Sequence, residues 1–292
     1  MHDEPRFGPA GAPQWFKELR APTSDLPHLL QEEGLNALEY EAVRWGCTPQ
    51  IKQGDAERLG KNARKSDVWL TIHGSYYVNL LSKNETLEAS KRRLIACAVA
   101  AKWMNAHTIV FHTGYYTKKQ SHKKDLQNCI EALKGILETM QSMNIQANLG
   151  PETAGKLAQL GSLGEILTIC EEVDQTQPVI DWAHLHARQR GGLRDANDFQ
   201  RIVESIENRL GTKTVRNLHC HFSHVEYTFR GERRHHSLNA HRYGPKFESL
   251  ADVIINNNLH PVVISESPLL DVDAKKMRNI VYQKRRTSFI IR

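Results

Sequence analysis

The sequence lacks the features that mark membrane, secreted and disordered proteins. No apolar run approaches the roughly 18 residues that a membrane span needs, and the first residues show no basic region followed by an apolar core. Low-complexity tracts are absent from the 292 residues, of which 40% are hydrophobic and 25% are charged. We therefore expect a soluble, cytoplasmic, globular protein that folds as a single domain over residues 1–292.

Cysteine is scarce, whereas histidine is abundant. The five cysteines are an odd number, are widely scattered and contain no C-x-x-C pair, so we expect free thiols rather than a disulfide framework or a thiolate zinc site. The chain has 15 histidines and a formal net charge of +6. This charge favours encounters with an anionic partner, but it does not identify one.

Short apolar runs alternate with helical patterns along the chain. In residues 84–106, for example, Leu87, Leu94, Ala98 and Ala101 recur at helical spacing. The expected strands are 6–10, 36–40, 68–73, 108–114, 145–153, 178–184, 216–223 and 260–267; the expected helices are 84–106, 121–144, 162–173, 195–210 and 247–258, with a last barrel helix and a frayed end in 275–292. Eight such units predict an α/β fold, a parallel (β/α)8 TIM barrel.

Carboxylates and imidazoles occur at the C-terminal ends of six of these strands, where the substrate site of such a barrel lies. Three carboxylates brought close together would repel each other unless cations lay between them. Histidine and carboxylate oxygens are ligands that zinc, manganese and iron accept. We therefore expect a metal cluster at this mouth, formed by His73, His112, Glu152, Asp181, His184, His221 and Glu266. His219 is expected one layer deeper, and His186, His224, His236 and His241 in loops.

Several motifs in their order and spacing resemble those of the endonuclease IV family of apurinic/apyrimidinic (AP) endonucleases. They are "IHGSYYVNLLS", "FHTG", "PETAGK", "IDWAHLHA", "LHCHFS", "GERRHHSL" and "ISESP". This family, AP endonuclease family 2, belongs to the xylose-isomerase-like TIM-barrel superfamily. The resemblance implies two or three metal ions, usually zinc, that hydrolyse the phosphodiester on the 5′ side of an abasic site in DNA. It implies His73, His112 and Glu152 at the first metal, Glu152, Asp181, His221 and Glu266 at the second, and His184 and His235 at the third.

Two departures from the family pattern affect these expectations. Arg233 stands where the family usually has an aspartate, and a guanidinium cannot ligate a metal. Either Glu232 reaches the third metal, or water completes that site, or the metal is weak or missing. The loop after the second strand also lacks the family's aromatic and basic segment. Arg44 and Trp45 could contact a phosphate and displace a base there; alternatively, Trp45 packs on the barrel rim.

The resemblance also implies a mechanism. An activated water near the catalytic residues Glu152 and Glu266 would attack the phosphorus in line, and the third metal or Arg233 would stabilise the leaving 3′ oxygen. Tyr76 is a candidate DNA contact. The basic residues that could hold the DNA backbone, or could simply be solvated, are Lys118, Lys119, Lys123, Lys124, Arg188, Arg190, Arg230 and Arg234.

Two other functions remain open from the sequence. A sugar isomerase or epimerase of the same superfamily would use Glu152, Asp181, His221 and Glu266 to hold one manganese or similar ion, and would not need the additional histidines. A catalytically silent barrel that binds DNA or a protein partner would keep the metal as a structural clamp. We favour the nuclease, acting as a monomer, and the number of ions bound per chain distinguishes it from the isomerase.

Overall fold

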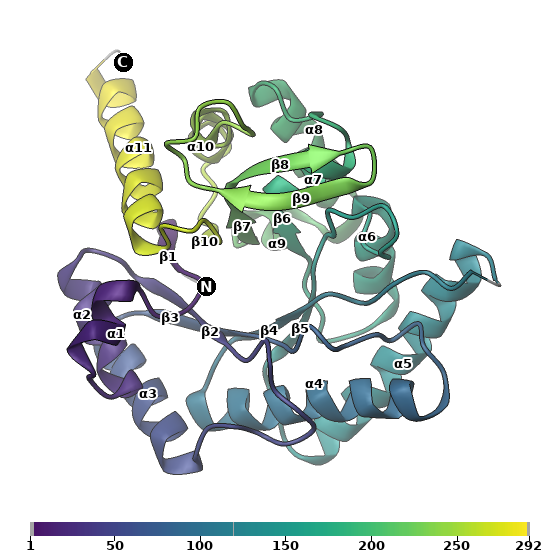
Figure 1. Ribbon diagram of the computed structural model, residues 1–292. Helices are drawn as coiled ribbons and strands as arrows, with labels where there is room; N and C mark the ends of the chain where they lie inside the picture. Colours follow the sequence, from purple (N-terminus) through teal and green to yellow (C-terminus); the bar gives the residue numbers. More distant parts are fainter. Residues whose placement is uncertain (1–2, 119, 291–292) are drawn as a thin grey trace.

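The computed structural model describes residues 3–118 and 120–290. Lys119 and the last two residues of the predicted frayed end lie outside these ranges. Within them, eight parallel strands close into a barrel surrounded by helices (Figure 1), which confirms the predicted (β/α)8 TIM barrel. The barrel strands are β1 (Arg6–Pro9), β2 (Ala37–Glu41), β3 (Trp69–His73), β4 (Thr108–Phe111), β5 (Asn148–Pro151), β6 (Val179–Asp181), β7 (His219–Phe222) and β10 (Val262–Ser265).

The barrel consists of two four-stranded parallel sheets joined at their edges. Their strand orders are β1-β10-β7-β6 and β2-β3-β4-β5. Single bridges between Ala10 and Glu39 and between Glu152 and Val179 close the two seams. Gly8 lies against one seam, where an added Cβ would lie 1.7 Å from the carbonyl oxygen of Ala37, so only glycine allows this approach of the two strands.

All the predicted helices are present, and the described residues contain further helices that were not predicted. The predicted ones are α4 (Asn84–Met104), α5 (His122–Ser142), α6 (Leu163–Glu172), α8 (Ala196–Leu210), α10 (Phe247–Asn256) and α11 (Asp271–Ile290). The unpredicted ones are α1 (Gln14–Leu19), η1 (Thr23–Asp25), α2 (Leu26–Glu32), α3 (Gln53–Lys65), α7 (Trp182–Arg188) and α9 (Thr212–Arg216). Capping boxes at Ser162 and Asp195 fix the starts of α6 and α8, because each satisfies backbone N–H groups that lack a helical partner.

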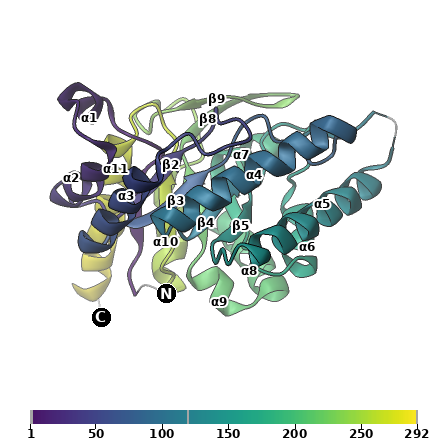
Figure 2. The same ribbon diagram turned by 90° about the horizontal axis from the view of Figure 1, so that it is seen from below.

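An antiparallel hairpin extends the chain over the mouth of the barrel. It consists of β8 (His224–Thr228) and β9 (Gly231–His236), which follow β7 directly. In Figure 2 this hairpin lies at one edge of the molecule and α9 at the opposite edge, so the two mark opposite ends of the barrel. The hairpin corrects the expectation that His224 and His236 lie in loops, and His186 likewise lies in α7.

The hydrophobic core fills the space between the barrel and its helices. It includes Phe111 and Phe222 on the strands and Phe199 and Phe247 on the helices, each at most 1% exposed. Cys97, Cys129 and Cys220 are buried in the same region as free thiols. No helix within the described residues is long and apolar enough to cross a membrane.

Candidate metal centre

Glu152 lies at the centre of a cluster of imidazoles at the barrel mouth. It follows β5, and its side chain is fully buried. Its Oε2 lies 3.5 Å from His73 Nε2 and 3.4 Å from His112 Nε2. Its Oε1 lies 3.2 Å from His221 Nδ1 and 3.3 Å from His184 Nδ1. Both carboxylate oxygens therefore face imidazole nitrogens.

Glu266 and Asp181 complete a second group beside Glu152. Glu266 follows β10, and its Oε1 lies 3.1 Å from His221 Nδ1. Asp181, Glu152, His221 and Glu266 each offer an atom within 4.8 Å of the others. The same holds for His73, His112 and Glu152, so the structure brings together both sets that the resemblance assigns to the first two metals.

Asp181 has two roles because β6 changes directly into α7. Its Oδ1 accepts a hydrogen bond from the backbone N–H of His184 (2.7 Å), so it caps the helix. Its Oδ2 is buried without a hydrogen-bond partner. The cap places His184 within the first turn, where its Nδ1 donates to the carbonyl of Thr153 (2.9 Å). The other nitrogen, Nε2, is left free to face the hairpin.

A β-bulge in the hairpin brings Glu232 to the site in place of Arg233. Glu226 pairs with Arg234 and Tyr227 with Glu232, so Arg233 is the extra residue on β9. As a result Glu232 Oε2 lies 3.5 Å from His184 Nε2, and Glu232 Oε1 lies 3.6 Å from His235 Nε2. The geometry therefore places Glu232, rather than Arg233, next to His184 and His235.

Histidine charges oppose the effect of burial on the acidic groups. Burial by itself would raise the pKa of Glu152, but His112 and His221 hold that pKa well below its usual range. The pKa of Glu266 is likewise lowered, because His221 outweighs burial. Burial dominates at Asp181 and raises its pKa to about 6. The pKa values of His184 and His221 are raised, because nearby carboxylates outweigh burial. The pocket therefore balances buried carboxylates with protons on these two histidines, and divalent cations would replace those protons.

The donor set fits divalent cations. Glu152 Oε2, Asp181 Oδ2 and His112 Nδ1 are buried polar atoms without a hydrogen-bond partner. An unpaired buried carboxylate oxygen is costly, and a cation next to it would remove that cost. The ligands are nitrogen and oxygen, a combination that zinc, manganese and iron accept. The centre opens into a cavity of about 480 Å³ lined also by Tyr76, Tyr115 and Glu41.

Two acidic residues of β2 belong to this region and were not predicted. Glu39 is fully buried, and its Oε1 lies 3.0 Å from His221 Nε2, on the side of the ring opposite Glu152. Its Oε2 accepts a hydrogen bond from His219 Nε2 (3.1 Å), so the expectation that His219 lies one layer deeper agrees with the structure. Glu41 ends β2 beside His73, and burial raises its pKa to about 7. The rule that polar strand ends face the mouth would have found Glu41.

The residues expected to contact substrate differ in accessibility. Tyr76 is 62% exposed and packs edge-to-face on His73, so it remains available. Arg44 is exposed in the loop after β2. The expectation that Trp45 displaces a base is wrong. Its side chain is only 5% exposed and packs on Tyr40, so it is a core residue. Arg233 is also corrected, because its guanidinium pairs with Glu226 on the exposed hairpin (2.6 Å) and is not among the described residues that line the cavity.

One of the predicted phosphate contacts is structural instead. The Nη1 of Arg188 donates to the carbonyls of Ala154, Lys156 and Gln159 at 2.8–3.2 Å. This guanidinium therefore fixes the loop that follows Glu152. The other predicted phosphate contacts that the structure describes are exposed: Lys118, Lys123, Lys124, Arg190, Arg230 and Arg234.

Comparisons with known proteins agree with the barrel fold. The profile of the xylose isomerase-like TIM barrel family matches residues 27–278, and the chain belongs to this family. Among curated relatives, the chain is 34% identical to the uncharacterized protein MJ0133 of Methanocaldococcus jannaschii over 276 residues, which cover 92% of this chain and 93% of that protein.

Solved structures with this fold include enzymes of two kinds. Endonuclease IV from Thermus thermophilus superposes with a TM-score of 0.73 at 17% identity, covering 96% of this chain and 100% of that chain. A D-psicose 3-epimerase from Clostridium cellulolyticum gives 0.61 at 13% identity, covering 90% of this chain and 93% of that chain. Identities this low establish the shared fold alone.

Proposed function

We propose that the protein is a metal-dependent phosphodiester hydrolase of the endonuclease IV type, which cleaves DNA on the 5′ side of abasic sites and uses two or three zinc ions. The observation that carries this proposal is the third ligand group. His184 Nε2 lies 3.5 Å from Glu232 Oε2, and His235 Nε2 lies 3.6 Å from Glu232 Oε1. His184 and His235 also each offer an atom within 4.8 Å of one on Asp181 and one on Glu266. A sugar epimerase with one ion needs only Glu152, Asp181, His221 and Glu266, so it would leave this group without a purpose.

When bound, the cations would make water nucleophilic at neutral pH and neutralise charge that develops on the phosphoryl and leaving oxygens. Glu266 is the more accessible catalytic carboxylate, because its side chain is 18% exposed whereas that of Glu152 is fully buried. We assign proton acceptance from the attacking water to Glu266. Glu152 holds His73, His112 and His221 in place, and Tyr76 contacts the substrate at the rim of the cavity.

The hairpin supplies the surface for DNA. Phe229 at its tip is 70% exposed, and the Arg230 guanidinium lies 5.2 Å from the centre of that ring. Arg234 is exposed on the neighbouring strand. A solvent-exposed aromatic ring with adjacent cations suits a base or sugar flanked by phosphates. Since Glu232 and His235 lie on the same strand, DNA held by the hairpin would lie next to the metal centre.

Cleavage of a duplex with one defined abasic site tests the proposal. We expect the zinc-loaded protein to nick only the abasic strand, chelator to stop the reaction, and added zinc to restore it. Glu152→Ala should lose both bound metal and cleavage, whereas Glu204→Ala, a matched change at an exposed position of α8, should retain both. If Glu152→Ala lost metal without losing cleavage, the role given to Glu152 would be wrong.

Metal counting separates the nuclease from the epimerase. Two or three zinc ions per chain support the proposal. One ion per chain, combined with interconversion of ketoses and no nicking of DNA, would show that the protein is an epimerase and not a nuclease. Two or three ions with neither activity would indicate a barrel in which the metals are only structural.

A further inference from the structure

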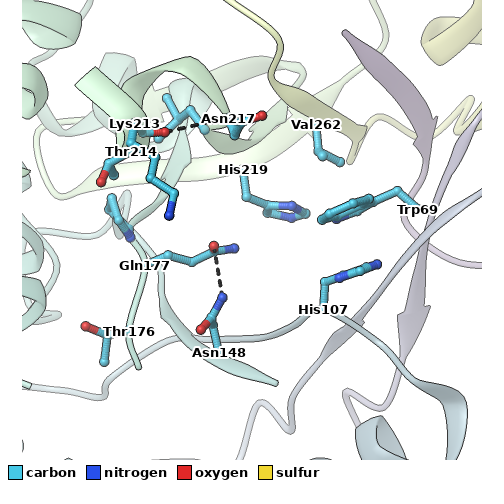
Figure 3. A pocket seen from close by; sticks show the side chains of 12 residues that line it. Trp69, His107, Asn148, Thr176, Gln177, Lys213, Thr214, Asn217, His219 and Val262 are labelled. Atoms are coloured by element: carbon cyan, nitrogen blue, oxygen red, sulfur yellow. Dashed lines mark hydrogen bonds between the residues drawn. The ribbon is translucent and has the colours of Figure 1, made fainter. Parts of the chain in front are cut away.

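A second cavity, of about 410 Å³, opens at the end of the barrel opposite the metal centre. Its walls are residues that begin the strands, including Trp69 of β3, Asn148 of β5 and His219 of β7. Lys213 and Asn217, in and just after α9, cover one side (Figure 3). The volume lies in the range of small-molecule sites.

Two residues that line this cavity carry a buried hydrogen-bond acceptor without a partner. His219 is 2% exposed, and its Nε2 is bonded to Glu39, a carboxylate that can only accept. In the neutral ring the other nitrogen, Nδ1, is then an acceptor, and it has no hydrogen-bond partner. The Oδ1 of Asn217 is also buried without one. Unpaired buried acceptors are rare in folded proteins, and a ligand with two hydroxyl donors would satisfy both.

The remaining walls define the rest of the ligand. The rings of Trp69 and His107 stack with their centres 3.5 Å apart and form a flat apolar side. Figure 3 shows the Lys213 side chain extending into the cavity towards Gln177. None of the described residues that line the cavity is acidic, so nothing there competes with an anion for this ammonium group.

We propose that this lower cavity is a binding site for a small hydroxylated anion, such as a hydroxy acid or a polyol phosphate. The hydroxyl groups donate to His219 Nδ1 and Asn217 Oδ1, the carbon skeleton packs against the Trp69–His107 stack, and the anionic group pairs with Lys213. His219 contacts Glu39, and Glu39 contacts His221, so the ligand lies two side chains away from the candidate metal centre. The proposal does not depend on the reaction at that centre.

NMR titration of the zinc-loaded full chain tests the site. The probes are D-glycerate and glycerol 3-phosphate, with glycerol and inorganic phosphate as partial analogues. The reporter is the indole N–H signal of Trp69, assigned by its loss in Trp69→Phe. We expect at least one of the two hydroxylated anions to shift this signal saturably, and the one that binds better identifies the anionic group. Glycerol and phosphate should require at least about tenfold higher concentrations, because each lacks one set of contacts.

Two variants and a control locate the binding. Lys213→Met and Asn217→Leu should each raise the ligand concentration at the midpoint of the titration at least about tenfold. Lys17→Met, on α1, should leave the midpoint unchanged. Circular dichroism and Tm verify that each variant folds, and the two variants remove different contacts. The proposal is overturned if neither anion shifts the Trp69 signal saturably, if both variants bind like the wild type, or if phosphate alone binds equally well.

Discussion

Glu39 Oε1 lies 3.0 Å from Nε2 of His221, while Nδ1 of the same ring faces Glu152 and Glu266. A carboxylate behind a ligating histidine fixes the orientation of the ring and raises its basicity. Because Glu39 is fully buried and also accepts a hydrogen bond from Thr71 (2.8 Å), its own position is fixed by the barrel. Glu39, inside the barrel, thus holds His221 in its orientation at the candidate metal centre.

Glu39→Gln should weaken zinc binding about 10- to 100-fold, because loss of an outer carboxylate commonly has an effect of this size. Competition with a chromophoric chelator measures the change. Glu226→Gln serves as the control, since Glu226 pairs with Arg233 on the exposed hairpin. Equal zinc affinity in Glu39→Gln and the wild type would show that His221 is oriented without Glu39.

Glu232→Gln should reduce the zinc content by about one ion per chain, since a carboxamide is a much weaker zinc ligand than a carboxylate. The metal content of the purified, zinc-saturated protein measures this change. Arg233→Gln, at the adjacent bulge position, should leave the content unchanged, because its guanidinium pairs with Glu226. Loss of a zinc ion in Arg233→Gln but not in Glu232→Gln would contradict the assignment of Glu232.

Zinc should bind less tightly as the pH falls through about 6. Burial raises the pKa of Asp181 to about 6, so below that value its carboxyl becomes protonated and a cation must displace the proton. The raised pKa values of His184 and His221, where nearby carboxylates outweigh burial, act in the same direction, since their ligating nitrogens must also be deprotonated. Binding should therefore release protons, and affinity should increase with pH. Calorimetry in buffers of different ionisation enthalpy measures proton release, and net proton uptake would be incompatible with these ligands.

The positions of the strands and most of the ligand-bearing ends were predictable, because both depend on local patterns. His73 and Asp181 lie at the ends of apolar runs, and Glu152, His184 and Glu266 follow such runs closely, so a parallel barrel necessarily brings them to one mouth. The α7 helix was not predicted, because Asp181 serves both as the last residue of β6 and as the cap of the helix.

Glu232 and Trp45 show where local patterns are insufficient. The one-residue shift at Arg233 arises from pairing across the hairpin, so no spacing along β9 alone indicates that Glu232 faces the site. Likewise, Trp45 follows a strand end like the ligands do, but it packs against Tyr40 in the core. Tertiary contacts decide which side of a loop is buried, and local patterns in a single sequence do not reveal these contacts.

Binding to an abasic duplex should weaken steeply with added salt, and the hairpin arginines should account for part of that dependence. Arg230→Gln and Arg234→Gln should each lower the slope of log K against log[salt] by about one, because each removes a phosphate contact. Fluorescence anisotropy with a catalytically inactive Glu266→Gln background measures the slope without cleavage. Lys65→Gln, at the end of α3, provides a matched loss of one exposed positive charge away from the hairpin. An equal change of slope in Lys65→Gln would indicate a general effect of net charge, and a slope near zero in the parent protein would rule out phosphate contacts as the basis of DNA binding.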